Sequence, residues 1–124
     1  MLISNTIIII ITAIIIFVID LVWLSTGGIH FKNMIAAIQS APVVIRFVPI
    51  IPIYIALAYL LNKAKTVQEA GLIGLATYTV FDMTNYAILK DYDLRIAMAD
   101  SIWGGVLFML SFSLIKYFNL DMHV

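Results

Sequence analysis

Residues 7–24 read IIIIITAIIIFVIDLVWL, and Asp20 is the one ionisable side chain among them. A membrane-spanning helix needs about 20 mostly apolar residues. Apolar character extends over about residues 2–25, without a basic start or a small-residue cleavage site. We therefore predict a retained transmembrane helix. Because a charge at the centre of such a helix costs about 2.5–3.5 kcal/mol on insertion scales, Asp20 is a candidate functional residue.

The whole chain has the composition of a membrane protein. It has 124 residues, of which 64% are hydrophobic and 11% are charged, and its mean hydropathy is +1.10. Soluble domains carry about 25% charged residues. A formal net charge of zero offers no basic surface for nucleic acid. The sequence has no cysteine, which excludes disulfides, thiolate metal sites and a cysteine nucleophile.

Three further apolar stretches follow the first. We predict helices at about residues 42–61, 66–89 and 94–118, with Pro49 and Pro52 kinking the second helix. The predicted fold class is all-α: a four-helix integral membrane bundle in a single domain, residues 1–124. An even number of crossings puts both termini on the same side of the membrane. The stretch 29–38 between the first two helices fits either a short amphipathic helix in the membrane interface or a plain loop.

The predicted helices bring their ionisable residues to one level. Counting about 1.5 Å per residue, Asp20, Asp82 and Asp100 all lie roughly 6–11 Å below the membrane face opposite the termini. Arg46, in the first turns of the second predicted helix, enters at the same level. We therefore predict one polar layer containing three acids and one base.

Aromatic and polar residues accompany the acids at helical spacing. Residues i and i+3 share a helix face, and each acid has such a partner. Trp and Tyr join a hydrogen-bond donor to an apolar body, which suits a half-wet pocket. The predicted ion or ligand pocket comprises Asp20, Arg46, Asp82, Asn85 and Asp100, lined by Trp23, Tyr78, Tyr86, Ser101 and Trp103.

Two interpretations of this layer stay open. In one it is a functional pocket, and in the other it is a polar network that only holds the helices together. Interhelical hydrogen bonds in membranes average about 0.6 kcal/mol, so three acids against one base would be an expensive way to join helices. We expect at least one of the three aspartates to be protonated near neutral pH, because neighbouring carboxylates disfavour one another's ionisation.

The order of residues in the last two predicted helices resembles a known family. Phe81-Asp82-Met83-Thr84-Asn85 and Asp100-Ser101-Ile102-Trp103-Gly104 resemble the motifs Tyr-Asp-Leu-Thr-Asn and Asp-x-x-Trp-Gly of the small four-helix bacterial membrane proteins called domain of unknown function 2177. The stretch Asp20-Leu21-Val22-Trp23-Leu24 resembles the first helix of that family. The resemblance implies an integral membrane protein with Asp20, Asp82, Asn85, Asp100 and Trp103 as its marked positions. It implies no particular activity.

Three functions fit these observations. The first is proton- or cation-linked transport, alone or as an oligomer. The second is a structural or assembly subunit of a membrane complex, and the third is a lipid-modifying membrane enzyme or an accessory to one. The sequence offers no evident catalytic set, metal site or cofactor motif, and so the enzyme is the least favoured. The expected partners are the lipid bilayer and a homo-oligomer or membrane complex.

Overall fold

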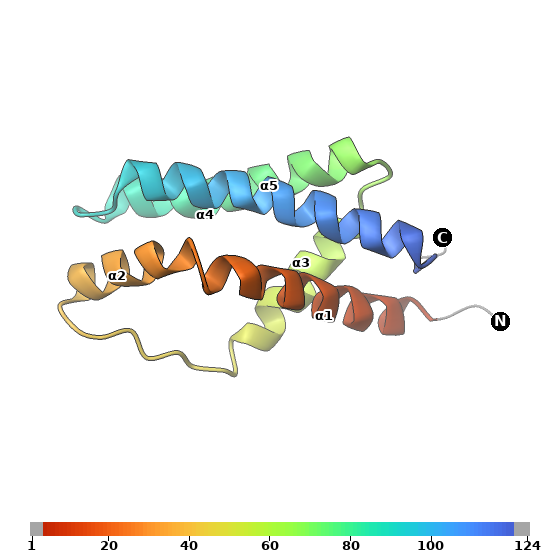
Figure 1. Ribbon diagram of the computed structural model, residues 1–124, viewed down its shortest axis with the longest axis horizontal. Coiled ribbons are helices and arrows are strands. Elements are labelled where there is room, and N and C mark those ends of the chain that lie inside the picture. The colour runs from red at the N-terminus through yellow and green to blue at the C-terminus, as the bar shows by residue number, and fades with distance from the viewer. Residues whose placement is uncertain (1–3, 121–124) are drawn as a thin grey trace.

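Helices make up most of the chain. The computed structural model describes residues 4–120, and within them there are five helices and no strand: α1 (Asn5–Leu24), α2 (Gly28–Gln39), α3 (Ile50–Leu61), α4 (Val67–Ile88) and α5 (Leu94–Tyr117). In Figure 1, α4 and α5 form an antiparallel hairpin, and α1 and α2 follow one another along the opposite side. Helix α3 crosses from α1 toward the start of α4. The beginning of α1 and the end of α5 lie at the same end of the molecule (Figure 1).

The helix ends follow from capping side chains. Thr66 accepts a hydrogen bond from the Glu69 N–H group at 3.1 Å, and Asp93 accepts one from the Arg95 N–H group at 2.7 Å. These caps begin α4 and α5 within a residue of the predicted starts at residues 66 and 94. Helix α1 agrees with the first predicted helix from Asn5 onward, and residues 2–3 of that prediction lie outside the described residues.

The predicted helix over residues 42–61 is wrong in its first half. Residues 42–49 are not helical, and α3 begins only at Ile50, after Pro49. The β-branched run 43–45 has low helix propensity. The residue before each proline is also disfavoured in the α conformation, which applies to Ala41 and Val48. Pro42 and Pro49 therefore delay the helix, and Pro52 lies in the first turn of α3, whereas we had expected Pro49 and Pro52 to kink a longer helix.

A break separates α1 from α2. The Ser25 hydroxyl donates to the Leu21 carbonyl group, and the Thr26 hydroxyl donates to the Val22 carbonyl group at 2.7 Å. Both side chains therefore give hydrogen-bond donors to carbonyl groups in the last turn of α1. The Trp23 ring packs so closely on Gly27 that an added Cβ there would overlap it. Of the two alternatives left open for residues 29–38, the helix is confirmed, because α2 covers them.

The core lies between the α4–α5 hairpin and α1. Ile16, Leu107 and Phe108 are fully buried there. Helices α4 and α5 approach closely at Gly74, where a Cβ would overlap the Gly104 carbonyl oxygen. Small residues at such a crossing let two helix backbones approach one another, as is common between helices in membranes.

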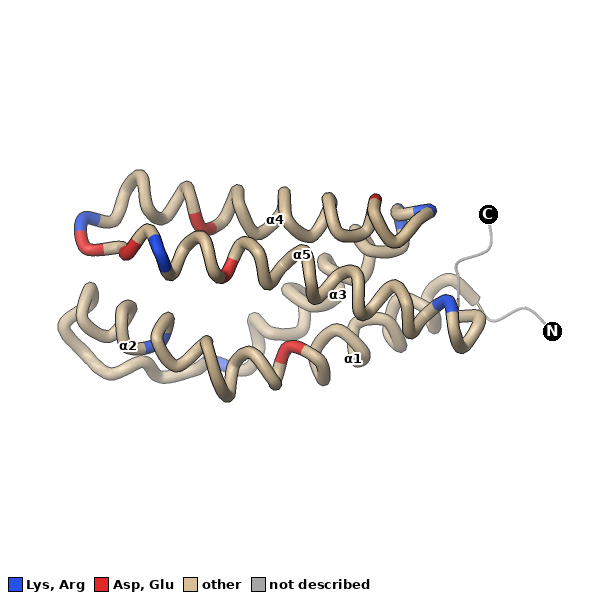
Figure 2. The backbone as a smooth tube through the Cα atoms, turned by 45° about the horizontal axis from the view of Figure 1, so that its top comes forward, with Lys and Arg blue, Asp and Glu red and all other residues tan. Residues whose placement is uncertain are grey.

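Among the described helices, α1 and α5 are each long and apolar enough to cross a membrane. Helix α3 is apolar but shorter, with 12 residues. Lys and Arg residues are absent from α1 and α4, and in α5 they occur only at its two ends, as Arg95 and Lys116 (Figure 2). The central lengths of these three helices therefore carry acids but no bases.

Candidate functional site

Two Asp-x-x-Trp motifs face one another on antiparallel helices. Asp20 and Trp23 lie near the end of α1, and Asp100 and Trp103 lie in the first half of α5. Three residues correspond to about 4.5 Å along a helix. Because α1 and α5 run in opposite directions, each aspartate comes level with the tryptophan of the other helix.

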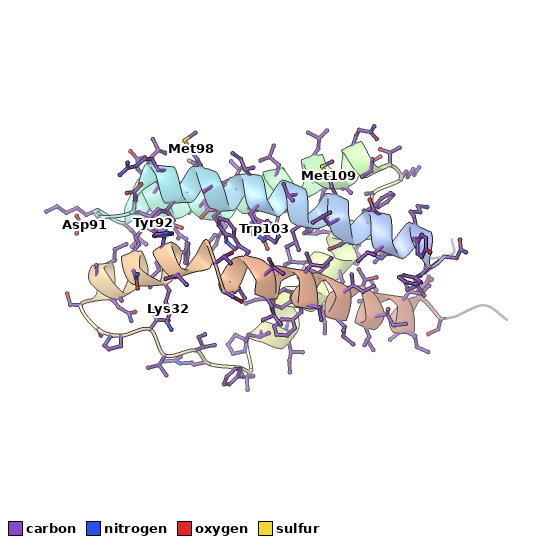
Figure 3. All side chains as sticks on the ribbon, in the orientation of Figure 1. Lys32, Asp91, Tyr92, Met98, Trp103 and Met109 are labelled. Atoms are coloured by element: carbon purple, nitrogen blue, oxygen red, sulfur yellow. The ribbon has the colours of Figure 1, made fainter. Side chains whose placement is uncertain are left out.

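This geometry produces a reciprocal pair of hydrogen bonds, which we call the indole clasp. The Trp103 Nε1–H group donates to Oδ1 of Asp20 at 2.8 Å, and the Trp23 Nε1–H group donates to Oδ1 of Asp100 at 3.1 Å. The two indole rings stack with their centroids 5.5 Å apart and their planes 11° apart. In Figure 3, Trp103 points from α5 into the space between the hairpin and α1. The clasp joins the α1 side of the molecule to the α4–α5 hairpin.

Asp20 has a second partner on α3. The Tyr54 hydroxyl donates to Oδ2 of Asp20 at 2.5 Å, so both carboxyl oxygens of Asp20 accept a hydrogen bond. Asp20 is 6% exposed, which shows that the carboxyl is bound by protein rather than by solvent. The ring of Tyr54 also contacts Phe17 edge-on, with centroids 5.1 Å apart. Tyr54 is a site residue that the sequence analysis missed.

Asp82 is held entirely within the α4–α5 hairpin. It is completely buried, and its Oδ1 accepts a hydrogen bond from the Tyr92 hydroxyl at 2.8 Å. Its Oδ2 lies 3.3 Å from the Ser101 hydroxyl, which also donates to the Ala97 carbonyl group at 2.8 Å. A hydroxyl has one proton to donate, so Ser101 cannot donate to both acceptors at once.

Tyr92, in the turn between α4 and α5, is the second site residue that the sequence analysis missed. Burial raises the pKa of the Tyr92 hydroxyl, and its hydrogen bond to Asp82 raises the pKa further. The hydroxyl therefore stays protonated, as a donor, throughout the physiological range. Figure 3 shows Tyr92 pointing from the turn toward α2. Phe31 of α2 covers its ring edge-on, with centroids 6.1 Å apart.

The remaining predicted pocket residues divide into two groups. The first group lies at the acids. The Tyr78 hydroxyl interacts electrostatically with all three acids, and its ring packs against Gly104. The Asn85 side chain interacts with the Tyr92 hydroxyl. Tyr86, by contrast, is 45% exposed. Arg46 is exposed in the irregular segment before α3 and forms no ion pair with the three acids within residues 4–120.

The three acids thus belong to one group of interacting side chains. The carboxyl groups of Asp82 and Asp100 interact with one another, and Asp100 also interacts electrostatically with Asp20. Yet no set of three or more His, Cys, Asp or Glu side chains in residues 4–120 is arranged to hold a metal ion.

An apolar layer, which we call the plug, separates this network from the terminal end of the molecule. Ile16 lies one turn before Asp20 on α1, and Leu107 and Phe108 lie one turn after Trp103 on α5. All three plug residues have 0% exposure. Beyond them the next polar pair is Asn62 and Thr12, whose side chains lie 3.2 Å apart. Between these two levels the core of the molecule is therefore apolar.

An apolar groove of about 250 Å³ runs between α1 and α3. Its lining contains one polar side chain, that of Tyr54, and is otherwise formed by Ile10, Ala13, Ile14, Phe17, Ile50, Ile51 and Ile55. Since the Tyr54 hydroxyl donates to Asp20, the groove ends against the acid network.

The family assignment agrees with these features. A family model described as a predicted membrane protein, DUF2177, matches residues 5–117. The chain belongs to this family. No curated protein and no solved structure matches it. The family resemblance predicted from the sequence is confirmed. Of the five positions that the resemblance implied, Asp20, Asp82, Asp100 and Trp103 lie in the hydrogen-bonded network, and the fifth, Asn85, interacts with the Tyr92 hydroxyl.

Proposed function

We propose that this membrane protein crosses the bilayer four times, with both termini on the same side, and that it carries out proton-linked transport, alone or as an oligomer. The network of Asp20, Asp82 and Asp100 is the proton-binding site. One observation carries this proposal: three interacting buried acids have no Lys or Arg partner in the described chain.

The energetic argument concerns neutralisation. An ionised carboxylate taken from water into an apolar interior costs far more than a neutral carboxylic acid. Without a basic partner, three acids can lower this cost by binding protons. The hydroxyl of Ser101 supports protonation within the network, because when it donates its proton to the Ala97 carbonyl group, a proton on Asp82 is needed for a hydrogen bond between Asp82 and Ser101. Release of that proton would be favoured whenever a cationic substrate replaced it.

The burial of the three acids supports a carrier in preference to an open pore. The plug of Ile16, Leu107 and Phe108 lies between the network and the terminal end, and at the opposite end the buried Tyr92 joins Asp82 to the α4–α5 turn. A carrier must expose its site to one side at a time, which requires such a closed layer. We expect the plug to open when α1 and α3 move relative to the α4–α5 hairpin.

The test is proton flux in liposomes that contain the purified protein, driven by a pH difference and a membrane potential. We expect flux in the wild type and its loss, to the level of protein-free liposomes, in Asp82→Asn. The matched control is Asp93→Asn, which changes an acid outside the network while keeping an oxygen to cap α5. Absence of flux from correctly folded wild-type protein, with and without added cations, would reject the proposal.

A structural or assembly role is the second candidate, and the indole clasp favours it. Two reciprocal hydrogen bonds and a ring stack could fix the packing of α1 on α5 without any transport. In that case Asp20→Asn and Asp100→Asn would lower stability or complex assembly, and no variant would affect flux.

A lipid-linked role is the third candidate, supported by the apolar groove that ends at Tyr54. It predicts a lipid that co-purifies with the protein.

A further inference from the structure

Ser111 differs from the other two serines of α5. The hydroxyls of Ser101 and Ser113 each donate to the carbonyl group four residues earlier in the helix, at 2.8 Å. The Ser111 side chain has 0% exposure, and within residues 4–120 its hydroxyl has no hydrogen-bond partner. Nearly all buried polar groups in folded proteins are bonded to protein or to ordered water. The surroundings of Ser111 therefore require a further polar group.

The register of α1 against α5 places Ser111 level with Thr12. The indole clasp sets this register, because its two hydrogen bonds cross between the antiparallel helices. Starting from Asp20 and Trp103, each step of four residues back along α1 is matched by a step of four residues forward along α5. The successive facing pairs are Ile16 with Leu107, Thr12 with Ser111, and Ile8 with Ile115. None of these six side chains is more than 4% exposed, as expected for residues that face one another.

Thr12 belongs to a group whose hydrogen bonds are also incomplete. Its hydroxyl oxygen accepts a hydrogen bond from the Asn62 side chain at 3.2 Å, but its own proton has no acceptor among the described residues. Asn62 donates its other amide proton to the Ala58 carbonyl group at 2.9 Å, and so it has none left for Ser111. The Ser111 and Thr12 hydroxyls do not bond to one another. We call Thr12, Asn62 and Ser111 the hydroxyl layer.

The hydroxyl layer has smaller side chains on α1 and α5 than the levels on either side of it. Both neighbouring pairs consist of large aliphatic side chains, whereas Thr12 and Ser111 are small. Asn62 enters the space between them from the end of α3. A buried water needs about the volume of one solvent probe and two to four polar partners. The two hydroxyls and the amide oxygen of Asn62 provide three such partners.

We propose that the hydroxyl layer binds one water molecule, which accepts the protons of the Ser111 and Thr12 hydroxyls and donates to the amide oxygen of Asn62. Water fits this layer better than a cation, because the three side chains carry no charge and would leave a cation uncompensated in the core. A bridging water is nearly as favourable as a direct hydrogen bond. The water therefore joins α1, α3 and α5 at one point on the terminal side of the plug.

The deciding experiment is a structure of the full chain, wild type and Ser111→Ala, at a resolution that shows ordered water. We expect density for one water within about 3 Å of the Ser111 and Thr12 hydroxyl oxygens in the wild type, and its loss in the variant. A layer packed without water overturns the proposal. A direct bond between the two hydroxyls, or one from Ser111 to the Leu107 carbonyl group, also overturns it.

A double-mutant cycle of Ser111→Ala with Thr12→Val tests the same bridge by unfolding in mixed micelles. Either substitution alone removes one partner of the water. We therefore expect coupling of about threefold or more in the unfolding equilibrium constant. The matched control joins Thr12→Val with Ser113→Ala, an exposed serine of the same helix that bonds to the Met109 carbonyl group. Coupling no larger than in this control overturns the bridge.

A role for this water in transport rests on the proposed function, whereas the water site itself does not. The plug separates the hydroxyl layer from the three acids, so a proton that leaves the acids toward the terminal end reaches this water first. Ser111→Ala should therefore lower proton flux several-fold in liposomes, and Ser113→Ala should leave it at the wild-type level. Equal flux in both variants overturns the role in transport. Absence of flux from the wild type rejects the transport proposal instead, and the density still decides the water site.

Discussion

The indole clasp predicts a specific pattern of coupled stabilities. The perturbations are Trp103→Phe, which keeps an aromatic ring but removes the Nε1–H group, and Asp20→Ala, which removes its acceptor. The donor and acceptor are 2.8 Å apart. The equivalent pair on the other side is Trp23→Phe with Asp100→Ala, across 3.1 Å. A double-mutant cycle on each pair isolates the interaction from the other effects of the substitutions.

The expected magnitudes follow from the setting of these bonds. Hydrogen bonds between helices in a membrane protein average about 0.6 kcal/mol and reach about 1.7 kcal/mol. We expect coupling of about 1 kcal/mol for the pair of Trp103 and Asp20, which has the shorter distance. A smaller value is expected for Trp23 and Asp100. Trp103→Phe alone should cost about 1–3 kcal/mol, since it also weakens ring stacking worth about 0.5–1.5 kcal/mol.

The assay is unfolding by sodium dodecyl sulfate in mixed micelles, followed by far-ultraviolet circular dichroism. The control cycle joins Trp103→Phe with Asp100→Ala, two residues that share a helix and make no hydrogen bond with one another. The paired cycles should show larger coupling than this control. If the control coupling equals or exceeds the paired values, the reciprocal assignment of donors and acceptors is refuted.

Two further predictions concern the α4–α5 hairpin. Gly74→Ala should lower the free energy of unfolding by about 1–3 kcal/mol, because its Cβ would overlap the rigid Gly104 carbonyl group, whereas Gly71→Ala meets only the flexible side chain of Met109 and should cost less. Equal unfolding free energies for the two variants would contradict the close approach at Gly74. The backbone N–H group of Arg95 holds the pKa of Asp93 below its usual value of 3.8. Its contribution to stability is therefore complete above the unfolded pKa and is lost as the pH falls through the folded pKa. An acid titration of stability should lose this component in Asp93→Asn, and an unchanged titration would show that the cap does not act through charge.

The sequence predicted α4 and α5 well because local signals determine their ends. Thr66 and Asp93 are cap residues placed directly before long helical patterns, and each does cap its helix. The start of the second predicted helix was wrong because hydropathy alone does not show which residues can adopt helical backbone angles. Residues 42–61 are apolar except for Arg46, but Pro42, Pro49 and a β-branched run leave the first part without helical structure.

In the candidate site, too, features that depend on one helix could be predicted from the sequence, whereas features that depend on how helices pack could not. Counting residues along helices was enough to expect the three acids at one level, because depth depends only on the helix rise. Arg46 was counted along a helix that does not exist there; it is exposed and forms no ion pair with the three acids within residues 4–120. Tyr78 and Tyr86 lie about 40° to either side of Asp82 around α4, and the sequence cannot tell which side α5 covers. It covers the side of Tyr78, so Tyr86 is left exposed.

Tyr54 and Tyr92 could not be found from spacing. Each reaches an acid on another element, across 34 residues of sequence in the pair with Asp20 and across the α4–α5 turn in the pair with Asp82. A tyrosine in an apolar helix or in a polar turn is ordinary, and nothing nearby marks either one as a partner. Only the oblique path of α3 and the tight hairpin turn bring these hydroxyls to the carboxyls.

The hydrogen bonds divide the network between two parts of the molecule, α1 with α3 and the α4–α5 hairpin, which we call the two bodies. Asp20 stays with Tyr54 if α1 and α3 move together, and Asp82 stays with Tyr92 and Ser101 inside the hairpin. The clasp is the connection between the bodies that such a movement would break.

Asp100 would then be the acid whose surroundings change most. Its hydrogen bond from Trp23 crosses between the two bodies, and its remaining interaction within the hairpin is with Asp82, another acid. Loss of a donor favours the protonated form of a carboxyl, whereas recovery of the donor favours release of the proton. Under the proposed function, opening and closing of the clasp would therefore couple proton binding at Asp100 to the relative position of α1 and α5, as a proton-linked carrier requires.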